Sequence, residues 1–256
     1  MRTVTRKSAR EIAEMRRAGR IVAEVLALVE EALRPGVSAR ELDALAEAHI
    51  RRRGGRPSFK GYRLDRDQPP FPGSICVSID DEVVHGLPDA RVIRPGMLVS
   101  IDAGAEVNGY HADAARTFYV GEPPAEVAAF IETTRLALMA GIMAAVPGAR
   151  IGDISAAIED VARAGGYGIV RECVGHGIGT RMHEPPDVPN YRTGARGLEL
   201  VPGICLAIEP MLTMGSPAVG LRDDGWTIAT LDGSLAAHFE HSIVVTEHGP
   251  EILTTV

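Results

Sequence analysis

The sequence predicts an α+β fold made of two similar halves, and three observations lead to this prediction. Four amphipathic helical patterns occur in two pairs, at about residues 9–33 with 39–53 and 125–145 with 154–164. Each pair precedes runs rich in β-branched and aromatic residues, as expected for strands. In each half, a Pro-Gly pair also opens an apolar run that ends in a carboxylate. One order of elements that occurs twice indicates a duplicated unit.

Local signals set the helix boundaries. The first two helices open with the S-x-x-E spacing of a capping box, Ser8 with Glu11 and Ser38 with Glu41. In both pairs, Pro-Gly ends the first helix and Gly-Gly ends the second. The order helix, Pro-Gly, helix, Gly-Gly therefore occurs twice.

The strands repeat in the same way. "RPGMLVSID" (94–102) and "VPGICLAIE" (201–209) both run from Pro-Gly through an apolar strand to a carboxylate seven residues after the proline. Asp102 and Glu209 are thus equivalent in position.

A second pair of carboxylates is also equivalent in position. Asp113 and Glu240 each stand at the start of a run of β-branched and aromatic residues. Two halves, at about 8–121 and 122–254, then contribute two carboxylates each. We expect a single catalytic domain over residues 1–256, whose halves close around a shared site.

Composition narrows the classes of function. The net charge of −7 and the pI near 5.6 argue against nucleic acid as a partner, since binding phosphates needs a clustered excess of Lys and Arg. No uninterrupted apolar run is long enough to predict a membrane span. Three widely spaced cysteines suit reduced thiols, and the basic start has no apolar secretion segment. These features favour the cytoplasm.

A hairpin brings two of the carboxylates together. Asn108-Gly109 between β-prone runs predicts a two-residue turn. With those two residues as the loop, Asp102 and Asp113 become diagonal neighbours on one face, about 7–8 Å apart at the backbone. Two carboxylates at that separation repel each other unless a cation lies between them. A pair of metal ions about 3.5–4 Å apart fits such a gap, although aspartates are also common near ordinary turns.

The other two carboxylates strengthen the metal interpretation. Glu209 lies in "ICLAIEPML" and Glu240 in "AAHFEHSIVV", where an unpaired buried charge costs several kcal/mol. Four such carboxylates and one histidine make an oxygen-rich set of donors. This set suits Mn²⁺, Fe²⁺, Co²⁺ or Zn²⁺ in a catalytic site better than a structural zinc, and the spacing does not choose among the ions.

Several motifs together resemble the type I methionine aminopeptidases of the pita-bread fold, over about residues 8–254. They are "VVHG" (83–86), Asp102 and Asp113 eleven residues apart, "GHGIG" (175–179), His183-Glu184-Pro185, "AIEP" (207–210) and "DDGWTIATLDGSLAAHFEHSIVVTE" (223–247). The resemblance implies a curved antiparallel sheet between pseudo-symmetric α+β halves. It also implies two divalent ions per chain, with the ligands Asp102, Asp113, His176, Glu209 and Glu240.

The resemblance also assigns the histidines. Glycines around His176 let the backbone approach the metals and the substrate while this side chain reaches a metal. His183 is similar to the family's histidine that hydrogen-bonds the scissile carbonyl or the substrate amide. His85 is similar to its other pocket histidine, which contacts the substrate backbone and assists proton transfer.

The implied reaction is removal of the initiator methionine from nascent proteins and peptides, with a small second residue preferred. In this mechanism, a hydroxide bridging the two metals attacks the first peptide carbonyl, and Glu209 shuttles the proton. The substrate's free α-amino group takes the remaining metal position. The family also suggests a monomer, and action on nascent chains suggests transient proximity to the ribosome.

In the family an apolar pocket receives the methionine side chain, and the matching positions here are Tyr62, Phe71, Cys76 and Trp226. A soft, aromatic pocket suits a thioether. The chain departs from the family at two places. Met182 stands where an aromatic residue usually precedes the second histidine, and "RLDRDQPP" (63–70) lengthens a short loop. That insertion either reshapes access to the pocket or is a surface loop.

Three alternatives stay open at this point. An Xaa-Pro aminopeptidase or creatinase-like enzyme would share the metal site, although such relatives carry a long extra N-terminal domain. A pita-bread scaffold that binds protein or RNA would not need all five ligands. A cysteine hydrolase based on Cys173 and His176 lacks a recognisable nucleophile turn in "ECVGH".

Overall fold

The computed structural model describes residues 4–63 and 68–256. The helices of these residues are α1 (Ala9–Ala32), α2 (Ala39–Arg52), α3 (Ala125–Ala144) and α4 (Ile151–Gly165). The strands of the main sheet are β1 (Arg56–Pro57), β2 (Ile75–Ile79), β4 (Leu98–Val107), β5 (Tyr110–Tyr119), β7 (Gly175–Gly177), β8 (Glu184–Val188), β9 (Cys205–Ile208), β14 (Glu240–Thr246) and β15 (Gly249–Ile252). Two smaller sheets are formed by β6 (Gly168–Ile169), β10 (Met211–Thr213) and β13 (Ala236–His238), and by β3 (Glu82–Val84), β11 (Val219–Leu221) and β12 (Ile228–Thr230).

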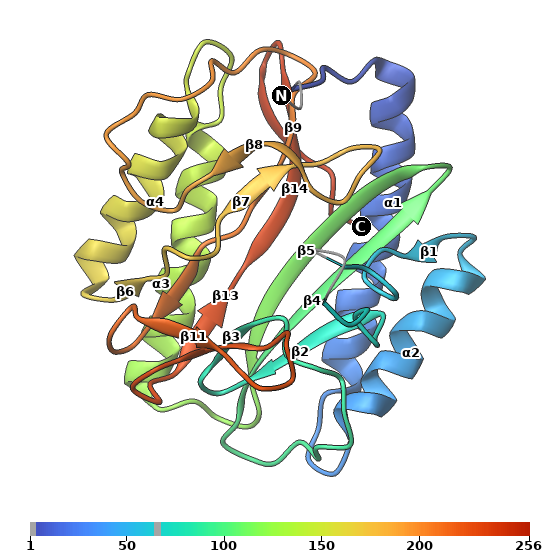
Figure 1. Cartoon of the computed structure of the whole chain (residues 1–256), viewed down its shortest axis with the longest axis vertical. Helices are drawn as coiled ribbons and strands as arrows, with labels where there is room; N and C mark the ends of the chain where they lie inside the picture. Colours follow the sequence, from blue (N-terminus) through green and yellow to red (C-terminus); the bar gives the residue numbers. More distant parts are fainter. Residues whose placement is uncertain (1–3, 64–67) are drawn as a thin grey trace.

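A nine-stranded antiparallel sheet connects the two halves of the chain. Its order is β1-β4-β5-β14-β9-β7-β8, with β2 added beside β4 and β15 beside β14. Figure 1 shows the long strands β4, β5 and β14 running between the helix pair α1 and α2 on one side and the pair α3 and α4 on the other. The predicted α+β arrangement around an antiparallel sheet is therefore confirmed.

The predicted helix starts are confirmed for the first pair. Both capping boxes form, and in each the serine hydroxyl accepts from the glutamate N–H while the glutamate carboxylate accepts from the serine N–H. The fourth helix begins three residues earlier than the expected 154, at Ile151. The reason is that the Asp153 carboxylate accepts from the Arg150 N–H (2.7 Å), so a different residue pair closes this helix end.

Each helix pair covers its own part of the sheet. Helix α1 packs across β4 and β5, with Val22, Val25 and Ile101 fully buried between them. Helices α3 and α4 pack against each other and bury apolar side chains against β9 and β14, such as Ile158 and Leu206. The two apolar cores hold the central strands from outside, so the opposite face of the sheet is available for a site.

Helix α3 is long and apolar enough to cross a membrane by length and composition alone. In the structure, its side chains Phe130, Leu138 and Ile142 are buried in the cores that include α4 and the sheet. Helix α3 is thus a core helix of this fold.

Gly19 in the middle of α1 gives a first testable prediction. A Cβ atom at this position would overlap the carbonyl group of Leu253. Alanine normally stabilises a helix interior by about 1 kcal/mol relative to glycine, but forced overpacking costs about 1–3 kcal/mol. The overlap is with backbone, which cannot rotate away, so the cost lies in the upper part of this range. We therefore expect Gly19→Ala to lower the free energy of unfolding by about 1–2 kcal/mol in urea denaturation. Arg17→Ala, on the exposed face of the same helix, is the control; a Gly19→Ala protein as stable as the wild type would contradict the expectation.

Candidate metal centre and substrate pocket

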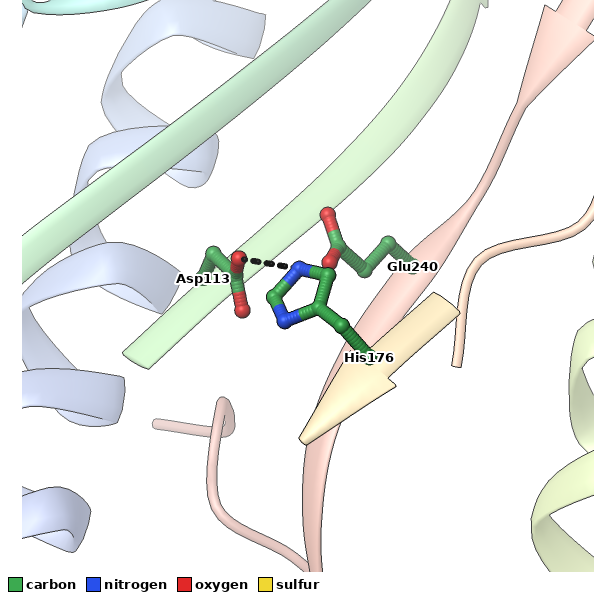
Figure 2. Close-up of side chains that lie close together, drawn as sticks. All are labelled: Asp113, His176 and Glu240. Carbon is green, nitrogen blue, oxygen red and sulfur yellow. Dashed lines mark ion pairs between the residues drawn. The ribbon is translucent and has the colours of Figure 1, made fainter. Parts of the chain in front are cut away.

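Three strands of the main sheet bring two carboxylates and an imidazole to one point. Asp113 lies on β5, Glu240 on β14 and His176 on β7, and one ligand atom of each lies within 4.8 Å of the others. The Asp113 Oδ2 atom is 3.6 Å from His176 Nε2. Figure 2 shows the three side chains converging from their separate strands. All three are buried, so the group could hold a metal ion away from bulk water.

Asp102 and Glu209 complete the wall of the same cavity. The β4–β5 register places Asp102 opposite Ala115 and Asp113 opposite Gly104, as the hairpin prediction requires. Glu209 directly follows β9, and its Oε1 atom is 3.5 Å from His176 Nε2. The structure thus brings together all five side chains that the sequence proposed as ligands.

The hairpin turn sets the register that aligns the two aspartates. Asn108 and Gly109 both have positive φ angles, 51° and 85°, as a type I′ turn requires. Ser242 on β14 then fixes one of the carboxylates, because its hydroxyl donates to Asp113 Oδ1 (2.8 Å). Local turn chemistry and one contact between strands therefore hold Asp113 in place.

The electrostatics of the centre fit divalent cations. Burial, and next the neighbouring Asp113 carboxylate, raise the pKa of Asp102, Glu209 and Glu240 well above the usual range. Burial also raises the pKa of Asp113, against the opposing effect of His176. One oxygen of Asp102 is buried without a hydrogen-bond partner. Crowded carboxylates with an unsatisfied oxygen are stabilised by a cation, and four carboxylates with one imidazole match the donors of catalytic divalent metals.

Two further histidines face this centre. The His183 ring lies 4.2 Å from the His176 ring between centroids, and Tyr62 Oη is 2.7 Å from His183 Nδ1. His85 follows β3 with a positive φ of 60° and packs edge-on against Trp226. Burial lowers the pKa of His85 to about 4; burial, and next His176, lower that of His183 to about 3. Both imidazoles are therefore neutral near pH 7, where each has one N–H donor and one acceptor.

A pocket with an aromatic wall opens onto the carboxylates. The predicted residues Tyr62, Phe71, Cys76 and Trp226 all line it, together with Phe59 and Met182. Phe71 packs edge-on against Trp226 at 5.1 Å between centroids, and Trp226 Nε1 donates to the Pro69 carbonyl (2.9 Å). The aromatic wall is therefore fixed by both packing and hydrogen bonding.

The expected insertion at 63–70 lies partly outside the described residues, because 64–67 are not described. Its described end contacts the pocket wall through Pro69, and Gln68 Nε2 donates to the Gly225 carbonyl (2.8 Å). This end of the insertion is therefore adjacent to Trp226. Its effect on access stays a prediction.

Sequence reasoning missed several residues that lie around the centre or support its histidines. His238 is buried, with an unpartnered Nε2 3.7 Å from Glu209 Oε2. Asn190 Nδ2 donates to the Glu209 carbonyl (3.1 Å). Lys7 forms a buried ion pair with Glu184, next to His183. The chain has only one other lysine, Lys60, but the rarity of lysine does not indicate a partner for either.

Comparison with known proteins places this geometry in a family. Residues 13–247 match metallopeptidase family M24. The chain is 48% identical to a methionine aminopeptidase of Clostridium acetobutylicum over 97% of both chains, and 45% identical to methionine aminopeptidase 1 of Bacillus subtilis over 98% of both. The crystal structure of methionine aminopeptidase from Thermotoga maritima superposes with a TM-score of 0.95 and 40% identity, covering 99% of this chain and 100% of that one. This match confirms the pita-bread fold. The prolidase from Pyrococcus furiosus, with a TM-score of 0.78 and 23% identity over 98% of this chain and 65% of that one, shares the fold.

Proposed function

This chain belongs to metallopeptidase family M24, and we infer from this membership and from its site that it removes the N-terminal methionine from peptides and proteins. The activity is that of a methionyl aminopeptidase. One observation carries the proposal: the buried carboxylate and histidine centre opens directly onto a pocket lined by aromatic and sulfur side chains. Such a pocket fits a thioether side chain beside the bond to be cut.

We propose that the centre holds two divalent ions of Co, Mn, Fe or Zn. The ligands would be the five converging side chains, Asp102, Asp113, His176, Glu209 and Glu240. Divalent ions bound there would supply Lewis-acid polarisation of the peptide carbonyl and a lower pKa for water.

The protein's own groups would then orient the substrate and move the proton. The water that attacks the first peptide carbonyl gives its proton to the Glu209 carboxylate, which lies at the edge of the centre. A neutral His183 donates a hydrogen bond to the same carbonyl, and Tyr62 fixes the orientation of its ring. His85 contacts the substrate backbone and assists proton transfer.

Specificity would come from the side chain and the free α-amino group of the methionyl residue. The side chain enters the pocket formed by Tyr62, Phe71, Cys76 and Trp226. The free α-amino group lies at the carboxylate centre, so a blocked amine prevents cleavage. Crowding beside the centre limits the second residue to small side chains.

The wider setting is also proposed. We expect one catalytic domain, duplicated in halves at about 8–121 and 122–254, in a monomer that acts on nascent chains in the cytoplasm near the ribosome. The equivalent positions of Asp102 and Glu209, each seven residues after the proline of a Pro-Gly pair, support the duplication. Asp102 lies within β4, whereas Glu209 directly follows β9. We expect no nucleic-acid or membrane partner.

The test is peptide cleavage by metal-stripped protein, before and after addition of Mn²⁺ or Co²⁺. Met-Ala-Ser, its N-formylated form and Ala-Pro-Ala are offered in parallel. Release of free methionine from Met-Ala-Ser alone, and only with metal, is the expected result. Cleavage of Ala-Pro-Ala instead would replace the proposal with an Xaa-Pro activity, and cleavage of the formylated peptide would disprove recognition of the free amine.

A further inference from the structure

A short segment before the first helix lies against the loop that carries His183. This N-terminal strap, residues 5–7, ends in Lys7, whose side chain is almost fully buried. The Lys7 Nζ atom is 2.8 Å from Glu184 Oε2, and the two side chains are only 5% and 8% exposed. A lysine and a glutamate shielded to this degree interact strongly, and neither can lose its partner without leaving an uncompensated buried charge.

Glu184 holds the loop between β7 and β8 in place through hydrogen bonds. It accepts hydrogen bonds from four groups: Lys7 Nζ (2.8 Å), Thr5 Oγ1 (3.2 Å), Thr180 Oγ1 (3.2 Å) and the Arg181 N–H (3.1 Å). The contact with the Arg181 N–H closes a tight loop around the two residues between them, Met182 and His183. The position of the Glu184 carboxylate therefore sets the position of the His183 backbone.

The strap is itself fixed to a second part of the site. The Lys7 N–H donates to the Gly203 carbonyl (2.7 Å), and Arg6 Nε donates to the Pro202 carbonyl (3.0 Å). Gly203 lies just before β9, the strand that leads to Glu209. The strap thus connects the loop of His183 with the start of the strand that presents Glu209.

Lys7 also explains one glycine of "GHGIG". A Cβ atom at Gly179 would collide with the Lys7 side chain. The Gly179 carbonyl accepts from the His111 N–H (2.8 Å), on the strand that carries Asp113. The lysine therefore occupies the space that a side chain at position 179 would need.

We propose that Lys7 is a positioning residue, which acts through Glu184 to hold His183 at the scissile carbonyl. The inference rests on the proposed function, because it assumes that His183 contacts the substrate. A group that orients a reacting contact typically affects turnover by about 10–100-fold. Metal affinity should be kept, because Glu184, the partner of Lys7, is not one of the five proposed ligands.

The experiment compares Lys7→Met, Lys7→Arg and the matched control Lys60→Met, which removes the chain's other, exposed lysine. For Met-Ala-Ser with saturating Mn²⁺, Lys7→Met should lower kcat by about 10–100-fold with little change in KM. Lys7→Arg should restore part of the loss, and Lys60→Met should behave as the wild type. Mn²⁺ titration by calorimetry should give an unchanged affinity for Lys7→Met.

A double-mutant cycle tests the role of Lys7 separately from the proposed role of His183. In a His183→Ala background, Lys7→Met should cost nothing further, because both changes remove the same contact. Equal losses of kcat in both backgrounds, or a parallel loss of Mn²⁺ affinity, would overturn the positioning role. If Lys7→Met does not fold, Lys7→Arg and Glu184→Gln are put through the same cycle. A His183→Ala protein with wild-type kcat would instead refute the proposed role of His183.

Discussion

Replacing Glu209 by Gln is expected to lower kcat/KM for Met-Ala-Ser by about 10²–10⁴-fold. The substitution keeps the shape of a side chain that lies 3.5 Å from His176 Nε2, but an amide cannot take a proton from the attacking water. The neutral amide also lacks the negative charge that binds a divalent ion. Steady-state kinetics at saturating Mn²⁺ measure the loss of turnover separately from weaker metal binding.

The control for this change is Glu199→Gln, which removes an exposed carboxylate paired with Arg150 on the surface. Glu199→Gln should leave kcat/KM unchanged. This result would show that losing one negative charge anywhere in the protein does not lower activity. Wild-type turnover in the Glu209→Gln protein would remove Glu209 from the mechanism. Proton transfer would then have to be reassigned to His85 or His183.

Part of this site could be predicted from the sequence, because short local motifs determine it. Asn108-Gly109 specifies a two-residue turn, and in a strand with a period of two the turn alone decides that Asp102 and Asp113 share a face. The capping boxes at Ser8 and Ser38 are just as local, and both form. Where the sequence carries such short-range chemistry, it predicted elements to within about a residue.

The parts that could not be predicted depend on contacts between distant segments. The Cα pairing of Glu240 with Ala115 closes the centre, but no turn or spacing in the chain specifies it. Lys7 lies 177 residues from Glu184, and no spacing or motif in the chain predicts that the two side chains pair. Long-range packing decides such contacts. The resemblance to a known family therefore supplied the ligand set that spacing alone could not complete.

Adding Mn²⁺ or Co²⁺ to the metal-stripped protein should raise its melting temperature, and His176→Ala should remove most of that rise. A ligand at 100 times its Kd stabilises a fold by about 2.7 kcal/mol, which corresponds to about 5–11 °C for a domain of this size. The shift is measured by differential scanning calorimetry at equal free metal. His49→Ala, which removes a histidine paired with Glu24 on the helices, is the control and should keep the full metal-dependent rise.

The pH dependence of that shift tests the electrostatic argument itself. Burial raises the folded-state pKa of Asp102, Asp113, Glu209 and Glu240, so the metal-free fold binds more protons than the unfolded chain does. The stability that these groups contribute is therefore complete below their unfolded pKa values, near 4, and is lost as pH rises through the folded ones. Metal binds the ionised carboxylates and offsets this loss, so the metal-induced rise in melting temperature should grow as pH rises above about 4. A metal-induced rise that is independent of pH would contradict binding at these carboxylates, because metal binding to buried carboxylates with raised pKa values must release protons.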